Sequence, residues 1–147
     1  MTKTEKIYPS NTVSLWLRGE HLEPNAITEM IGCAPSQSWC RGDEHTTSRG
    51  RIVTRKVGIW RLNADSRNAD FLKQISEILS KIQTKTNLIE IGLGIDEAEL
   101  SIFEAQDLHP GENYRASVQL DTQLISEIYR LGISLSFEIQ VASDSQS

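Results

Sequence analysis

Residues 121–141, in the last quarter of the chain, read DTQLISEIYRLGISLSFEIQV and carry the clearest structural pattern in the sequence. Asp121 can accept hydrogen bonds from the first free amides of a helix. Leu124 and Ile128 then recur on one helical face until Gly132 ends it. After that glycine every second residue is apolar, which is the period of a strand with one buried face. The sequence therefore predicts a helix that leads through a glycine into an amphipathic strand.

The same two patterns recur along the rest of the chain. Helical spacing predicts a helix over 24–31, opened by Pro24 and closed by Gly32, and a second helix over 71–82 capped by Asn68 or Ser66. Alternation predicts strands over residues 12–18, 52–62, 89–95, 100–103 and 115–120. We expect the two strands at 89–95 and 100–103 to pair as a β-hairpin, with its turn at Asp96 and Glu97.

Most of these strands alternate instead of being apolar throughout, which favours a sheet with only one covered face. We therefore predict an α+β fold, a two-layer sandwich with an antiparallel or mixed sheet and helices on one face. The strand–helix–strand units at both ends are compatible with a ferredoxin-like arrangement. We expect one domain over residues 1–147, with flexible ends at 1–11 and 142–147.

Composition excludes several classes of protein. Of the 147 residues 38% are hydrophobic and 24% charged, with nine Gly, four Pro and two Cys, so the chain is neither disordered, collagen-like nor disulfide-rich. The first twelve residues lack the apolar run of a signal peptide, and no stretch approaches the length of a membrane helix. We expect a cytoplasmic protein that binds no membrane.

Charge is segregated along the chain. Residues 41–61 carry a net charge of +4, whereas residues 90–147 carry −9 within a total of −5. Such asymmetry can steer a charged partner, or the two segments can neutralise each other after folding. The overall acidity argues against a dedicated nucleic-acid binder, whose domain is usually basic.

The longest stretch without an apolar period runs from Cys33 to Arg51, and loops of this length are often functional. Candidate residues for binding a ligand or partner are in or beside this loop. They are Arg41, Asp43, Glu44, Arg49 and Trp60.

Cys33, Cys40 and His45 supply three candidate zinc ligands without an obvious fourth, so we expect neither a metal nor another cofactor. No nucleophile elbow, zinc-protease motif, P-loop or dinucleotide fingerprint is present. We therefore assign no catalytic residue.

Three short motifs occur in a characteristic order: Gly32-Cys33-Ala34-Pro35, then Arg41-Gly42-Asp43-Glu44, then Gly58-Ile59-Trp60-Arg61-Leu62. In this order the chain resembles the bacterial family known as domain of unknown function 4279. Ile31 and Ser36 depart from the Leu and Thr that are usual in that family. The resemblance implies a bacterial, non-secreted α+β domain and transfers no catalytic residue.

These observations favour a noncatalytic protein-interaction module, such as an immunity or accessory protein, whose acidic C-terminal half binds a basic partner. The alternative is a small-molecule-binding protein or enzyme that uses the 33–51 loop and a pocket near Trp60.

Overall fold

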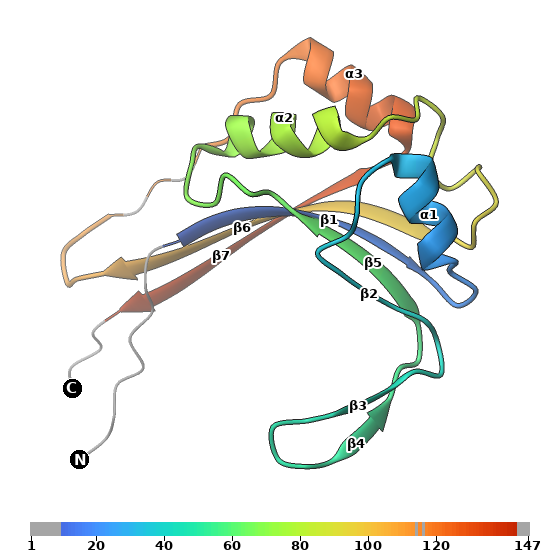
Figure 1. The fold of residues 1–147 in the computed structure, drawn as a ribbon. Coiled ribbons are helices and arrows are strands. Elements are labelled where there is room, and N and C mark those ends of the chain that lie inside the picture. Colours follow the sequence, from blue (N-terminus) through green and yellow to red (C-terminus); the bar gives the residue numbers. More distant parts are fainter. Residues whose placement is uncertain (1–9, 114, 116, 144–147) are drawn as a thin grey trace.

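The computed structural model describes residues 10–113, 115 and 117–143. Within them the elements are β1 (Ser10–Gly19), α1 (Pro24–Ile31), β2 (Gln37–Trp39), β3 (Glu44–Thr46), β4 (Ile52–Thr54), β5 (Gly58–Asn63), α2 (Phe71–Lys81), β6 (Glu97–Leu108), α3 (Thr122–Leu131) and β7 (Ser134–Ser143). The predicted α+β class is confirmed, because α1, α2 and α3 all cover the same face of one mixed sheet (Figure 1).

The main sheet has the strand order β2-β5-β1-β6-β7. β1 is antiparallel to both of its neighbours, β5 and β6, whereas β6 and β7 are parallel. β5 and β6 therefore run in the same direction on either side of β1, and α2 connects them. This is a split β-α-β unit of the ferredoxin-like kind, located in the middle of the chain.

The core lies between the sheet and the helices. Val13, Leu15 and Leu17 project from β1 toward the helices and are fully buried. Leu15 pairs with Leu62 of β5 on one side and with Leu100 of β6 on the other, so the apolar faces of three strands are aligned. Burial of this continuous face supplies most of the free energy that holds the helices to the sheet.

One buried polar side chain fastens α2 to the central strand. Gln74 is fully buried, and its Oε1 accepts a hydrogen bond of 2.9 Å from the backbone amide of Val13. Its Nε2 donates to the carbonyl oxygens of Asn11 and Ala69 at 3.2 and 2.9 Å. The donor and acceptor groups of this carboxamide are both hydrogen-bonded. It therefore fixes the position of α2 relative to β1 without the free-energy cost of an unpaired buried amide.

The helix ends follow the sequence signals with one correction. Asp121 accepts from the amide of Leu124 at 2.8 Å, and Gly132 closes α3 in the left-handed conformation, as predicted. The prediction that Asn68 or Ser66 caps α2 is wrong, because Asp70 caps it by accepting from the amide of Lys73 at 2.8 Å.

The predicted strand over residues 89–95, and the hairpin it would form, are wrong. Residues 88–96 form turns, and β6 begins at Glu97, where a hairpin turn was expected. Gly92 and Gly94 have φ of 84° and 78°, a conformation that no regular strand uses. The alternating apolar residues are divided between core and surface instead, with Ile95 buried and Ile89 exposed.

Two further predicted elements need correction. Residues 115 and 117–120 form no strand, and residue 116 of that predicted element lies outside the described residues. The strand predicted over 52–62 is divided into β4 and β5, which belong to different sheets. The loop predicted over 33–51 contains two short strands, of which β2 extends the main sheet and β3 pairs with β4 in a hairpin.

The flexible ends predicted at 1–11 and 142–147 overlap the first and last strands of the chain. Ser10 and Asn11 belong to β1, and Ala142 and Ser143 belong to β7. Residues 1–9 and 144–147 lie outside the described part of the chain.

Across the described residues, no helix is both long enough and apolar enough to cross a bilayer.

The loop between β5 and α2 is held by the carboxylate of Glu77. Burial acts to raise the pKa of this group, but hydrogen bonds from the backbone amides of Asp65 and Ser66 and from Lys81 outweigh it, and the pKa is lowered to about 2. Lys81 also donates to Asp65 at 2.8 Å, so one ammonium group bridges two carboxylates. The loop is therefore fixed to α2 by charge-assisted hydrogen bonds.

We predict that Trp60→Ala lowers the free energy of unfolding by about 3–5 kcal/mol, because Trp60 is fully buried and its indole bonds to α1. Urea denaturation of both proteins measures the difference. As a second variant, Thr28→Val removes the hydroxyl to which the Trp60 indole donates at 3.0 Å. It should cost about 1–3 kcal/mol, since a buried donor loses its partner. A loss below about 1 kcal/mol for Trp60→Ala would contradict the burial of this indole.

We also predict that Glu77→Gln is destabilising at neutral pH and nearly neutral in acid. A carboxylate whose folded pKa is about 2, against an ordinary value of 4.5, contributes stability above pH 4.5 that is lost as the pH falls toward 2. The expected loss is about 2–3 kcal/mol at pH 7, measured by denaturation at several pH values. An equal difference at pH 7 and pH 2.5 would contradict the assignment.

Candidate functional site

The candidate residues of the long loop lie on a hairpin arm, defined here as residues 40–57, which contains β3 and β4. The arm extends on the side of the main sheet that faces away from the helices (Figure 1). Arg41 is exposed at the base of the arm, where it lies 3.7 Å from Glu20. Glu44 and Arg49 are exposed further along it. The structure therefore places these three side chains along a surface and gathers them into no enclosed cavity.

Asp43 has a structural partner in the arm. The carboxylate of Asp43 accepts a hydrogen bond from the backbone amide of Cys40 at 2.8 Å. The backbone amide of Asp43 donates to the carbonyl oxygen of Cys40 at 3.2 Å. Its carbonyl oxygen accepts from the amide of Arg55 at 2.7 Å. These bonds close the turn that begins the hairpin, as aspartate commonly does in turns.

Trp60 stands apart from the other candidates. It is on the helix side of β5 with 0% exposure, and its indole donates to Thr28 of α1. A fully buried side chain presents no surface to a ligand or partner. The structure therefore separates Trp60 from Arg41 and Arg49, because the sheet lies between the core and the arm.

A small groove marks the base of the arm, with a volume of about 270 Å³. One wall is Trp39, whose indole donates to the carbonyl of Val57 at 3.2 Å. The guanidinium of Arg55 stacks on the same ring at 3.8 Å from its centroid. His45 lies in this groove and is half-buried. The stacking holds the arm to the end of the main sheet by a cation–π contact.

The basic and acidic segments do not neutralise each other within the described residues. The ion pair of Arg41 is with Glu20, and Glu97 and Glu99 pair instead with Arg18 at 3.7 and 3.6 Å. Both segments thus keep their charge available at the surface.

The two cysteines and the nearby histidine occupy different environments. Cys33 packs against the core, and burial raises the pKa of its thiol, against a smaller lowering by Lys81. Cys40 is exposed, and neither cysteine forms a disulfide. His45 is on the arm. No group of three His, Cys, Asp or Glu side chains in the described residues is arranged to hold a metal ion.

An apolar surface that the sequence patterns did not reveal lies on the edge strand β7. The four apolar side chains of its helix-facing side keep between 39% and 47% of their surface exposed. They are Leu135, Phe137, Ile139 and Val141. Alternation predicted a buried face here, but alternation reports only that one face is apolar. We call this surface the β7 face.

The β7 face is only partly covered, because the helix above it is shorter than the strand. α3 has ten residues and spans about 15 Å. β7 also has ten residues but spans about 33 Å, since a strand rises more than twice as far per residue. Phe71 at the start of α2 reaches the ring of Phe137, with ring centroids 5.8 Å apart. A comparison of element lengths in the sequence is the signal that could have found this surface.

Carboxylates accompany the β7 face. Glu104 of β6 is the register partner of Ile139 and lies on the same side of the sheet. β6 and β7 carry Glu97, Glu99, Glu104, Asp107 and Glu138 and no basic residue. Since Glu97 and Glu99 are paired with Arg18, the negative charge of this edge comes from Glu104 on the helix side and from Asp107 and Glu138 on the opposite side.

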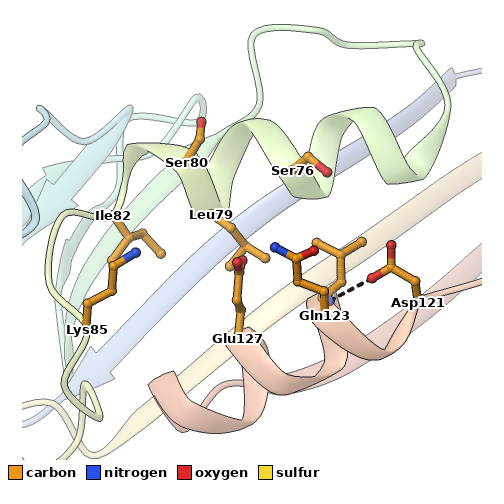
Figure 2. Close-up of a pocket in the computed structure, with 9 residues that line it drawn as sticks. Ser76, Leu79, Ser80, Ile82, Lys85, Asp121, Gln123 and Glu127 are labelled. Atoms are coloured by element: carbon orange, nitrogen blue, oxygen red, sulfur yellow. Dashed lines mark hydrogen bonds between the residues drawn. The ribbon is translucent and has the colours of Figure 1, made fainter.

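A second groove, of about 370 Å³, lies along the seam between α2 and α3 (Figure 2). Gln123 and Glu127 point from α3 toward α2, above an apolar floor that includes Leu79. Asp121 lies at its end, where its carboxylate caps α3. The polar groups come from both helices without converging on one point, so this groove presents no acid–base or nucleophilic arrangement.

We predict that replacing both Arg41 and Arg49 with alanine changes the free energy of unfolding by no more than about 0.5 kcal/mol, because exposed ion pairs contribute little. Denaturation at two salt concentrations measures this. Arg18→Ala is the control, and it should cost more because that guanidinium contacts two carboxylates and the Trp16 ring at the centre of the sheet. A salt-sensitive loss of stability in the double variant would mean that these arginines neutralise the acidic half of the chain.

Comparison with protein-family models identifies the same family that the order of the short motifs resembles. A search of curated proteins and a search of solved structures find no match. The family model described as domain of unknown function (DUF4279) matches residues 5–142, which is nearly the whole chain. The mixed sheet, the hairpin arm and the β7 face are therefore features of a chain that belongs to the DUF4279 family.

Proposed function

We propose that this chain is a noncatalytic, cytoplasmic protein-interaction module that binds an extended, basic segment of a partner protein along β7. The observation that carries the proposal is the β7 face, an apolar surface left open on the edge strand of the sheet. Exposed apolar patches bordered by polar groups are typical of interaction sites. The partner segment adds a strand to the sheet and places alternate side chains over the apolar surface.

The backbone of β7 supports strand addition. β7 is the last strand of the sheet order, so its outer row of amide and carbonyl groups faces no other strand among the described residues. Natural edge strands are usually protected by charges, prolines or bulges. β7 has ten residues, one charged side chain and no proline, so it is an unusually open template.

The charge of the edge selects the kind of partner. Glu104, Asp107 and Glu138 lie on β6 and β7 without a basic residue on either strand. A partner segment with lysine or arginine among its apolar residues complements them, and this attraction speeds association. Burial of the four half-exposed side chains contributes on the order of 4 kcal/mol, from which the ordering of the partner segment must be subtracted.

Ile139→Lys tests the proposal, because it adds a positive charge in the middle of the β7 face. The probe is a ten-residue peptide in which lysine alternates with valine, titrated into isotopically labelled protein at low salt. We expect shifts in the amide resonances of β7 and a binding constant at least tenfold weaker for the variant. Ile52→Lys is the matched control, since Ile52 is an exposed isoleucine in a strand of the arm, and it should bind as the wild type does.

Three results would contradict the proposal. The first is no binding of the lysine peptide at millimolar concentration. The second is equal binding of a peptide with glutamate in place of lysine, because the carboxylates of the edge should repel it. The third is a stable dimer in sedimentation that Ile139→Lys dissociates, because β7 would then pair with a second copy of this chain.

A further inference from the structure

We propose that the sheet face opposite the helices carries a binding site for a phosphorylated small molecule, held by Arg61 and Arg67. A pocket of about 510 Å³ opens there between β1, β5 and the loop that follows β5. This volume is within the range of small-molecule sites and exceeds what a single phosphate group fills. The site is distinct from the β7 face, which lies on the helix side at the far edge of the sheet.

Arg61 reaches this pocket from the middle of β5. Its backbone neighbours Trp60 and Leu62 are buried under the helices, so Arg61 faces the opposite side. Its guanidinium carbon lies 4.9 Å from the centroid of the Trp16 ring, which holds the side chain by a cation–π contact. The position of the charge is therefore set before any ligand arrives.

The guanidinium of Arg61 has hydrogen-bonding capacity that the described residues do not use. Its Nε is buried and has no hydrogen-bond partner there. Buried polar groups are nearly always paired, so the unpaired Nε–H shows that protein acceptors do not saturate this guanidinium. Among the described residues neither Arg61 nor Arg67 lies within ion-pair distance of a carboxylate, in contrast to Arg18, which has two.

The other polar groups of the pocket are oriented to donate. The Ser14 hydroxyl donates to the Asn63 carboxamide oxygen at 2.8 Å, which leaves the amide NH₂ of Asn63 as a donor. The Ser36 hydroxyl oxygen accepts from the Asn63 backbone amide at 2.9 Å, so its own proton is available. Two guanidinium groups, one amide and one hydroxyl thus supply donors to one ligand, which is the chemistry of an oxyanion site.

The single carboxylate at the pocket does not oppose an anion. Asp65 is paired at 2.8 Å with Lys81, which also contacts Glu77, so these three groups together carry one negative charge against the two positive charges of Arg61 and Arg67. The consecutive backbone amides of Asp65 and Ser66 donate to the carboxylate of Glu77 on α2. The wall of the pocket that carries Arg67 is therefore fixed to α2, and the local charge from Arg61 and Arg67 remains positive.

Phosphate is favoured because planar guanidinium groups match its geometry and because a doubly charged anion gains most from two cations. The test uses inorganic phosphate and glucose 6-phosphate, with glucose as the neutral control, in a buffer free of phosphate and sulfate. We expect calorimetry to show binding of both phosphorylated probes, with glucose 6-phosphate at least tenfold tighter than phosphate. Glucose itself should not bind.

Two variants and two controls identify the site. Arg67→Met, at an exposed position, should weaken glucose 6-phosphate binding about tenfold without changing the unfolding midpoint. Arg61→Lys keeps the charge but removes the planar fork, so it should also weaken binding about tenfold. Its spectrum assigns the Arg61 Nε–H resonance of the wild type, which should shift on titration. Arg41→Met and Ile139→Lys, in the arm and the β7 face, should bind as the wild type does.

The proposal fails if neither probe binds at 50 mM, or if Arg67→Met and Arg61→Lys bind glucose 6-phosphate as tightly as the wild type. A reduction in Arg41→Met alone would move the anion site to the arm and contradict the assignment. An Arg61 Nε–H resonance that does not respond to a ligand that binds would show that this guanidinium only supports Trp16. Ile139→Lys should weaken peptide binding at β7 and leave phosphate binding unchanged. Failure of the phosphate-site proposal therefore does not decide the protein-interaction proposal.

Discussion

The central strand β1 is the constraint on which the rest of the structure depends. It is the middle strand of the described sheet, is antiparallel to both neighbours, and separates the parallel strands β5 and β6. Its alternation sends Val13, Leu15 and Leu17 into the core, while Gln74 of α2 bonds to its backbone. If this strand slipped by one residue, its apolar side chains would turn to the open face and the helices would lose their support.

The same alternation decides which side chains project from the sheet face opposite the helices. Ser14 and Trp16 alternate with the buried residues of β1, so they project from the opposite face of the sheet. On β5, Asn63 is the register partner of Ser14, and Arg61 is the register partner of Trp16. A ladder that is fixed by its buried side therefore places a hydroxyl, an indole, a guanidinium and a carboxamide next to one another. Rigid strands hold such groups more precisely than loops do.

The two outer parts of the fold differ in charge and in support. Beyond β2 the chain extends into a basic hairpin arm, which is held at its base by the stacking of Arg55 on Trp39. At the other edge, β7 is acidic and apolar and only partly covered by α3. A molecule with opposite charges at its two ends orients an approaching charged partner.

Much of the fold was determined by local sequence. The helices at 24–31 and 122–131 and the strands at both ends were predictable because each combines a clear period with its own stop signal, such as Gly32 or Gly132. The strand predicted at 89–95 was wrong because alternation is also produced by a turn whose apolar residues are divided between core and surface, where Gly92 and Gly94 adopt positive φ. The spacing of apolar residues alone cannot distinguish a strand from such a turn.

The candidate sites depended more strongly on tertiary structure. The sequence could mark Arg41 and Arg49 as loop residues and Trp60 as apolar, but only the fold placed Trp60 beneath α1, away from the arm. The sequence could not place Arg61 and Arg67 at one pocket, because that pocket forms only when β5 pairs with β1 and Glu77 fixes the following loop. The sequence determines which residues face the same way along one element. Which faces remain uncovered is decided by the relative lengths and positions of separate elements, and these follow from packing.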